Sequence, residues 1–272
     1  MTKVCPYILA FLLVPSLVLT GCSSLPGVQE PTDEEINAEA AKAYAEVKAK
    51  SKISKNAEWT AMVNRVSERI AEASGEKGFK WEVVLIENKE PNAWCMPGGK
   101  MAVYTGIMPI LKTEAALAAV MGHEVAHATR RHGKQRYARA IKSSYANALI
   151  GAAAVVGGQV LCKSENCKKL TAIGGAAGAL ALTFFDRKFS RGDESEADQY
   201  GQIYMARAGY DPAESIKLWE RMDAASGGKA PPEFMSTHPS GSTRQGNLRK
   251  WLPEAERVYG GTSEKYGLGE KI

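Results

Sequence analysis

The motif His-Glu-Val-Ala-His at residues 123–127 constrains the fold of this chain more than any other feature of the sequence. Two His residues four positions apart lie on one face of an α-helix, where both imidazoles can reach a single zinc ion. A Glu next to the first His is placed to act as a base towards water that the metal activates. Leu117, Val120 and Met121 precede the motif, so we expect this helix to be mostly buried. The alternative is a solvated face on which His pairs with Glu, and it is disfavoured because unpaired imidazoles and carboxylates are costly in a buried helix.

A catalytic zinc site needs a third protein ligand and one position left open for water. The acidic segment 192–198, Gly-Asp-Glu-Ser-Glu-Ala-Asp, is the best source of that ligand. Glu194 and Asp198 are four residues apart and share one helical face. We therefore predict that Glu194 binds the metal together with His123 and His127, and that Asp198 orients one of the two His rings.

Three nearby polar residues have other expected roles. Glu196 points away from the metal-binding face of its helix, and metal binding by Glu196 is the alternative ligand assignment. Asp193, with Glu196 three residues later, suits an N-terminal helix cap. His132 lies five residues after His127, off the ligand face, so we expect it at the surface.

Residues 1–21 have the features of an export signal. Lys3 is their only charged residue, and an apolar run and then small residues follow it. This run is too short to span a membrane, which needs about 20 apolar residues. The sequence Leu-Thr-Gly-Cys at 19–22 resembles the lipobox of bacterial lipoproteins, in which the Cys is acylated and begins the mature chain. The alternatives are an ordinary signal peptide cut near Gly21, which leaves Cys22 unmodified, and an uncleaved anchor.

The lipobox resemblance implies a location for the protein. Ser23 follows Cys22 where retention at the inner membrane usually has Asp, so the outer membrane is favoured. Several acyl chains on Cys22 would hold the protein at the periplasmic face of that membrane without a spanning helix. Residues 22–31, which include Ser, Pro and Gly, would then form a lipid-anchored tether. Loss of residues 1–21, with one Lys, changes the net charge from +5 to +4, which gives no reason to expect a nucleic-acid partner.

Three Cys follow Cys22 in the mature chain, which should face an oxidising periplasm. Cys162 and Cys167 enclose only Lys-Ser-Glu-Asn, so we predict a local disulfide that pins a loop. A two-thiol metal site is the alternative, but no His or further Cys lies nearby to complete it. Cys95 is left as a free thiol, either buried or at the side of a cleft.

We expect an α+β fold that is mainly α-helical, in one domain over 32–260 with a flexible tail at 261–272. Hydrophobic spacing and capping patterns predict helices, and β-branched and aromatic residues between Pro and Gly predict strands. The predicted helices are 32–50, 56–74, 114–130, 194–208, 212–224 and 242–256, and the predicted strands are 79–86 and 100–105. The Gly- and Ala-rich stretches 146–161 and 170–185 are too short to span a membrane. We expect buried or hairpin-forming helices there, with shallow insertion into the lipid surface as the alternative.

Four groups of residues together resemble one enzyme family. They are His-Glu-Val-Ala-His at 123–127, Glu-Ser-Glu-Ala-Asp at 194–198, Asn-Ala-Trp-Cys-Met-Pro-Gly-Gly at 92–99 leading to Val-Tyr-Thr-Gly at 103–106, and Thr-His-Pro at 237–239 with Arg244. The chain resembles the zinc metallopeptidase family of Ste24, the CAAX prenyl protease, and of the periplasmic protein BepA. It is most similar to bacterial lipoprotein members, because a lipobox replaces spanning helices. The resemblance implies a mainly helical zincin-like fold with a small β-sheet beside the active-site helix, whose edge strand binds extended peptide.

The resemblance also implies a role for each matching residue. The implied roles are zinc binding by His123, His127 and Glu194, base catalysis by Glu124, and orientation of the ligands by Asp198. His238 and Arg244 lie near the metal in such enzymes, where the His caps the zinc at rest or assists the oxyanion. Other interpretations stay open: a turn residue for His238, and an ion pair with a surface carboxylate for Arg244.

Substrate contacts are expected along the sheet. If residues 100–105 form an edge strand, their backbone groups would hydrogen-bond peptides of many sequences. The residues expected to contact substrate are Asn92, Ala93, Met101 and Val103. Trp-Cys-Met at 94–96 departs from the commoner Phe-Ala-Leu of the family, so the resemblance does not extend to the lining of the subsite.

Two functional hypotheses follow. The first is a zinc-dependent endopeptidase, anchored at the periplasmic face of a Gram-negative outer membrane, that hydrolyses unfolded or misassembled envelope proteins beside outer-membrane assembly factors. Glu124 would take a proton from zinc-activated water and deliver it to the leaving nitrogen. The alternative is a chaperone-like assembly factor whose zinc site is structural or held closed by His238. The peptidase chemistry rests on residues, whereas the quality-control role rests on resemblance.

Overall fold

The computed structural model describes residues 30–140, 143, 189–226, 242–269 and 272. Several predicted features lie outside these residues: the signal peptide, the lipidation site Cys22, the disulfide of Cys162 with Cys167, the apolar stretches 146–161 and 170–185, and His238.

Two helices begin the described chain, and both start at caps that their sequences predict. Helix α1 (Asp33–Lys50) has a reciprocal capping box, in which Thr32 Oγ1 accepts the N–H of Glu35 at 3.2 Å and the Glu35 carboxylate accepts the N–H of Thr32 at 2.8 Å. Helix α2 (Ala57–Ser74) is capped by the side chain of Asn56. The predictions of helices at 32–50 and 56–74 are confirmed.

Three strands form a small sheet within the described residues. They are β1 (Glu82–Ile86), β2 (Ala93–Met96) and β3 (Lys100–Tyr104), in the spatial order β1-β3-β2. Strand β3 pairs in parallel with β1 and antiparallel with β2. The prediction of an edge strand at 100–105 is therefore wrong, because both sides of β3 are hydrogen-bonded. Strand β2, which sequence reasoning missed, is an edge strand instead, and β1 is the other.

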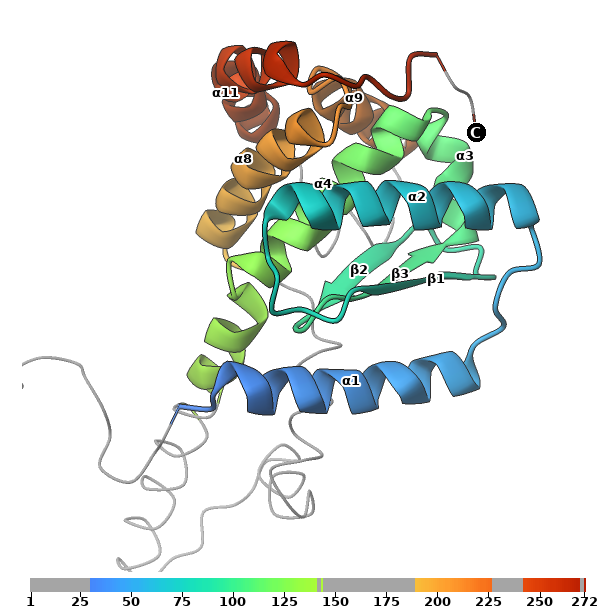
Figure 1. The fold of residues 1–272 in the computed structure, drawn as a ribbon, viewed down its shortest axis with the longest axis vertical. Coiled ribbons are helices and arrows are strands. Elements are labelled where there is room, and N and C mark those ends of the chain that lie inside the picture. The colour runs from blue at the N-terminus through green and yellow to red at the C-terminus, as the bar shows by residue number, and fades with distance from the viewer. Residues whose placement is uncertain (1–29, 141–142, 144–188, 227–241, 270–271) are drawn as a thin grey trace, which may run out of the picture.

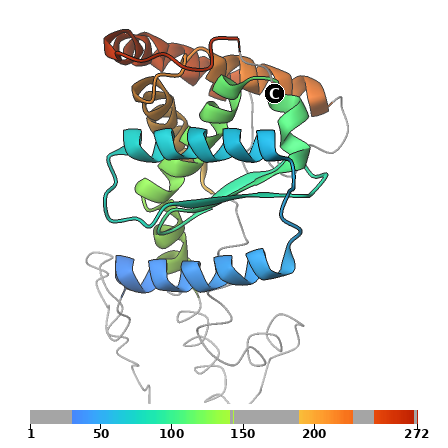
Figure 2. The same ribbon diagram turned by 45° about the vertical axis from the view of Figure 1, so that its right-hand side comes forward.

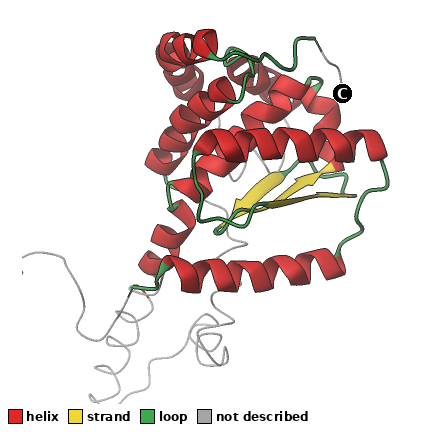
Figure 3. Cartoon of the chain, in the orientation of Figure 1, coloured by secondary structure: helices red, strands yellow, loops and turns green. Residues whose placement is uncertain are grey.

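The sheet lies between α1 on one face and α2 on the other (Figures 1, 2 and 3). Alternate residues of β3 face opposite layers, as the strand period requires. Met101 and Val103 belong to the main core, whereas Ala102 packs in the smaller cluster under α1. Tyr44 of α1 donates a hydrogen bond from its hydroxyl to the carbonyl of Met101 at 3.1 Å, which fixes α1 across the sheet.

Helix α4 (Glu114–Thr129) follows the short helices η1 (Thr105–Ile107) and α3 (Met108–Leu111) and carries the 123–127 motif. Every residue of α4 before its last is buried, because α2, α8, α9 and β2 all pack against it. The predicted buried helix is confirmed. A further helical segment at 132–140 follows after two turn residues.

Helix α8 (Arg191–Arg207) crosses α4 at a pair of glycines. A Cβ on Gly122 would lie 2.6 Å from the carbonyl oxygen of Gly201, and a Cβ on Gly201 would lie 2.7 Å from the backbone N of His123. Only residues without a side chain fit this crossing, which brings the acidic start of α8 beside the His motif. Helix α8 is capped by Ser190 with Asp193 in a capping box, so the predicted cap of Asp193 with Glu196 is wrong.

Helices α9 (Glu214–Ser226) and α11 (Ser242–Gly261) complete the described helical part, and α11 runs five residues beyond its predicted end. None of the helices in the described ranges is long and apolar enough to cross a bilayer.

The residues after α11 pack on the domain. The N–H of Tyr266 donates to the carbonyl of Gly209 at 2.8 Å, and the guanidinium of Arg69 lies 3.5 Å from the centre of the Tyr266 ring. The N–H of Ile272 donates to the carbonyl of Lys112 at 3.0 Å. The predicted flexible tail is therefore wrong for 262–269 and 272, because backbone hydrogen bonds and an aromatic contact hold these residues.

Candidate metal centre and active site

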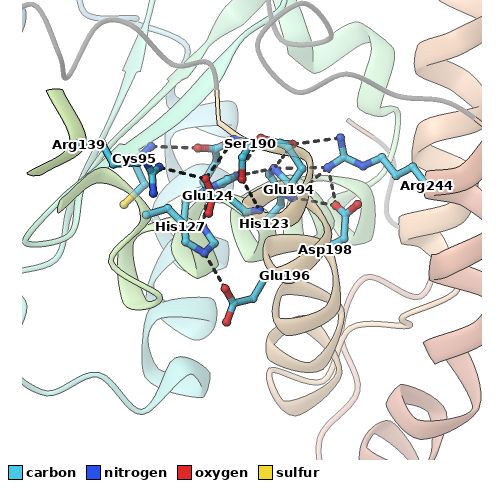
Figure 4. Close-up of polar contacts among 12 residues, drawn as sticks. Cys95, His123, Glu124, His127, Arg139, Ser190, Glu194, Glu196, Asp198 and Arg244 are labelled. Atoms are coloured by element: carbon cyan, nitrogen blue, oxygen red, sulfur yellow. Dashed lines mark hydrogen bonds and ion pairs between the residues drawn. The ribbon is translucent and has the colours of Figure 1, made fainter. Parts of the chain in front are cut away.

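Three side-chain donors converge where α4 and α8 meet: His123 and His127 from α4, and Glu194 from α8 (Figure 4). Nε2 of His123 lies 3.1 Å from Nε2 of His127 and 3.5 Å from Oε2 of Glu194, and Nε2 of His127 lies 3.4 Å from Oε1 of Glu194. A tetrahedral zinc ion with bonds near 2.0–2.1 Å holds neighbouring donors roughly 3.3 Å apart. All three residues are buried. The donor set therefore fits one such ion, with one coordination position left over.

The ring of His123 is fixed from behind by Asp198. Oδ1 of Asp198 lies 2.9 Å from Nδ1 of His123, on the opposite side of the ring from the metal-facing Nε2. Arg244, also buried, pairs with Asp198 and lies 3.4 Å from Glu194 Oε2, with its guanidinium 3.5 Å from the Trp219 ring centre. Burial and the Arg244 charge lower the pKa of His123, but hydrogen bonds with Asp198 and Glu194 outweigh them and raise that pKa to about 9. Metal binding has to displace this proton.

His127 has its own buried neighbour, His132, whose Nδ1 lies 2.9 Å from Nδ1 of His127. The prediction of His132 at the surface is wrong. Arg131 adopts a left-handed conformation with φ 62°, which reverses the chain after α4 and turns His132 back over the motif. Glu196 faces His132 and Arg130 and stands apart from the three donors, so the alternative of Glu196 as metal ligand has no support in this geometry.

Glu124 lies between the metal donors and the edge strand β2. It is buried, and its Oε2 accepts a hydrogen bond from the backbone N–H of Cys95 at 3.2 Å. Burial, together with the charge of Glu124, raises the pKa of the Cys95 thiol well above its usual range, so the thiol is protonated at neutral pH. Cys95 is a free cysteine, as predicted.

A small pocket adjoins these residues. Its walls come from α1, β2, α4 and the segments on either side of the undescribed 144–188 stretch, and include Ile36, Trp94, Glu124, His127 and Phe189. The ring of Phe189 stacks on that of His127, with centres 3.9 Å apart and planes at 19°. The pocket thus offers apolar surface directly beside the proposed base and a metal donor.

An ion-pair cluster ties the start of α1 to the rim of this pocket. Oδ2 of Asp33 accepts from Arg131 Nε at 2.8 Å, and its Oδ1 accepts from Lys134 Nζ at 2.5 Å. Arg131 also donates to Glu76 at 2.9 Å. The hydrogen bonds from Lys134 and Arg131 hold the pKa of Asp33 below its ordinary value.

The family model of peptidase family M48 matches residues 57–252, well over half of the chain. The chain belongs to peptidase family M48. It is 40% identical over 199 residues to the mitochondrial metalloendopeptidase OMA1 of Schizosaccharomyces pombe, a match that covers 72% of this chain and 54% of that protein. The mitochondrial metalloendopeptidase OMA1 of Saccharomyces cerevisiae is 34% identical over 189 residues, which is 67% of this chain and 50% of that protein. The beta-barrel assembly-enhancing protease of Escherichia coli K12 is 26% identical over 212 residues, which is 78% of this chain and 42% of that protein.

The M48 match confirms the family resemblance and the zincin-like, mainly helical fold with a small sheet beside the active-site helix. The mitochondrial OMA1 proteins of the two yeasts match at higher identity than the E. coli protease. The chain spans about half the length of the curated relatives it matches.

The structure places the other predicted M48 site residues as follows. Asn92 and Ala93, at the start of β2, are both fully buried. Met101 and Val103 are buried on β3, where each is paired with β1 and with β2, so their backbones cannot accept a substrate strand as predicted. Arg244 pairs with buried carboxylates, which excludes the surface ion pair that was its alternative interpretation.

Sequence reasoning missed the positions of three residues relative to the metal donors of this M48 site. His132 and Glu196 stand behind His127, and Phe189 covers one face of its ring. Spacing could not reveal His132, because the chain reverses at Arg131, which is neither Gly nor Asn. Phe189 lies more than sixty residues from His127 in the sequence and belongs to no motif, so the sequence holds no signal for it.

Proposed function

We propose that this M48 protein is a zinc-dependent endopeptidase, lipid-anchored at the periplasmic face of the outer membrane, that hydrolyses unfolded or misassembled envelope proteins. The observation that carries the peptidase part is the triangle of donors from His123, His127 and Glu194 with the Glu124 carboxylate beside an edge strand. The relatives named as metalloendopeptidases support the same chemistry.

The chain's own residues supply the proton transfers and the positioning. When bound, zinc lowers the pKa of its water ligand and polarises the carbonyl of the peptide bond. Glu124 accepts the proton of the attacking water and delivers it to the leaving nitrogen. The N–H of Cys95 holds the Glu124 carboxylate towards β2, where the peptide would lie. Arg244 already pairs with the carboxylates of Glu194 and Asp198, and His238 lies outside the described residues. Stabilisation of the oxyanion by either residue therefore stays a prediction.

Strand β2 is the surface to which we assign the substrate backbone. Within the described residues it pairs with β3 on one side only. The carbonyl of Asn92 accepts the N–H of Tyr104 and so points towards β3. The backbone N–H and C=O groups of successive strand residues point alternately to the two sides, so those of Ala93 and Cys95 point away from β3. A peptide added there would lie against Glu124, which the N–H of Cys95 already contacts.

The side chain of Asn92 supports the same assignment. It is fully buried, and its Oδ1 and Nδ2 have no hydrogen-bond partner within the described part of the chain. A buried amide without partners costs about 1–3 kcal/mol, which a bound peptide group would offset. Backbone recognition of this kind favours extended, unfolded substrates and tolerates many sequences.

The lipobox at 19–22 is the basis of the proposed location, and the name of the E. coli relative is the basis of the proposed envelope role and of a partnership with outer-membrane assembly factors. The proposed tether, residues 22–31, directly precedes Thr32, the cap of α1, and α1 forms part of the pocket wall. Ten extended residues reach at most roughly 35 Å, so the anchored site would work close to the membrane.

Replacement of Glu124 by Gln tests the proposed mechanism. The variant keeps the three metal donors and should retain zinc, while cleavage of an unfolded protein should fall by at least about 10²–10⁴-fold, the usual contribution of a general base. Retained cleavage would refute the mechanism. Protection of unfolded proteins without any cleavage by the parent would instead favour the chaperone-like alternative.

A further inference from the structure

The two His donors are fixed from behind in different ways. His123 meets a carboxylate directly, since Oδ1 of Asp198 lies 2.9 Å from its Nδ1. His127 meets a second imidazole, since Nδ1 of His132 lies 2.9 Å from its Nδ1. Beyond His132 stands a carboxylate, because Oε2 of Glu196 lies 2.9 Å from Nε2 of His132.

The proton positions in this chain follow from the contacts. Two nitrogens 2.9 Å apart need one proton between them, so only one of the two Nδ1 atoms is protonated. His127 turns its Nε2 to the metal donors, and a metal-bound imidazole keeps its proton on the other nitrogen. In the zinc-bound protein His127 would therefore donate to His132. The proton of His132 then lies on Nε2, which donates to Glu196.

Glu196 is itself held in place. Its Oε1 accepts a hydrogen bond from Nε of Arg130 at 2.7 Å, and the guanidinium of Arg130 lies 4.3 Å from the centre of the Tyr200 ring. Ser190 and Asp193 form the capping box of α8, so Glu196 has no capping role. The carboxylate thus fixes the tautomer of a fully buried imidazole, which is 0% exposed.

We infer that His132 and Glu196 are positioning residues for the zinc ligand His127, forming a two-step relay that matches the single step from Asp198 to His123. The relay orients the His127 ring and makes its Nε2 a better electron donor to the metal. The inference rests on the proposed zinc site, and it concerns residues that touch neither metal nor substrate.

Zinc affinity of the full chain, measured by competition with a chelator of known affinity, tests the inference. His132→Phe keeps a ring of similar size but removes the acceptor, and zinc binding should weaken about 10–100-fold, as for other partners of ligating His residues. Glu196→Leu removes the acceptor for His132 and should weaken zinc binding at least about tenfold, whereas Glu196→Gln keeps an acceptor oxygen and should stay within about threefold of the parent. The side chain of Glu196 is 36% exposed, so neither substitution of Glu196 disturbs the core.

The control is Glu220→Gln, which breaks a surface pair with Arg249 at 2.7 Å and should leave zinc affinity unchanged. Visible absorption of the cobalt-substituted proteins is a second readout, and it should change in His132→Phe and Glu196→Leu but not in Glu220→Gln. Zinc affinity of His132→Phe and Glu196→Leu within twofold of the parent would overturn the inference, even if the metal-free variants are less stable. A parent protein that binds no zinc would refute the proposed function itself.

Discussion

Gly201→Ala tests whether the close crossing of α4 and α8 sets the geometry of the metal site. The added Cβ would lie 2.7 Å from the backbone N of His123 and 2.8 Å from the carbonyl carbon of Gly122. Non-bonded carbon and nitrogen atoms rest about 3.5 Å apart, so the two helices have to separate by roughly 0.8 Å. Overpacking of this kind costs about 1–3 kcal/mol, and each kcal/mol lowers Tm by about 2–4 °C in a protein of this size.

The same separation moves Glu194, on α8, away from the two His donors on α4. Sites need their groups within about 0.5 Å of the productive geometry, so zinc affinity should fall at least about tenfold. Thermal unfolding of the metal-free protein and chelator competition measure the two effects separately. The control is Gly246→Ala in α11, where a Cβ meets nothing within 4 Å and higher helix propensity should stabilise by about 0.5–1 kcal/mol. Tm and zinc affinity of Gly201→Ala equal to those of Gly246→Ala would refute the reasoning.

Two further predictions concern the N-terminal part of the chain. Asp33→Asn removes the carboxylate that ties α1 to Arg131 and Lys134, and should lower the free energy of unfolding at pH 7 by about 0.5–1 kcal/mol in urea titrations. The pKa of Asp33 is lowered in the folded state, so its contribution to stability is present above the unfolded pKa of about 3.9 and is lost as the pH falls further. The difference in unfolding free energy between variant and parent should therefore persist down to about pH 5 and shrink at lower pH. Equal unfolding free energies at pH 7 would contradict this prediction. Cys22→Ser should move the protein from the membrane to the soluble fraction, and continued sedimentation with membranes would exclude lipidation of Cys22 as the anchor.

The metal donors were predictable because they depend on local geometry. A helix places residues four apart on one face, so the spacing alone pairs His123 with His127 and Glu194 with Asp198. The capping box of Thr32 with Glu35 is local in the same sense, and it starts α1 where the sequence indicates. The start of α8 was harder to predict, because its cap, Ser190, lies just before the acidic segment that is predicted to supply it.

The order of strands and the partners of His127 were not predictable from local pattern. β1 pairs in parallel with one side of β3 and β2 pairs antiparallel with the other, an order that no local sequence pattern specifies. The left-handed Arg131 then turns His132 back towards His127, which no helical extrapolation anticipates. Both features follow from packing between segments distant in the sequence, where single-chain periodicity carries no information.

The central claim is that this chain hydrolyses peptide bonds with one zinc ion, which His123, His127 and Glu194 would hold. Its most direct test is metal content and cleavage of an unfolded protein by the soluble form that starts after Cys22, before and after treatment with a chelator. We expect about one zinc per chain, loss of cleavage on removal of the metal, and recovery when zinc is added back. Cleavage that persists in the metal-free protein, or a fully zinc-loaded protein that cleaves no unfolded substrate, would contradict the claim.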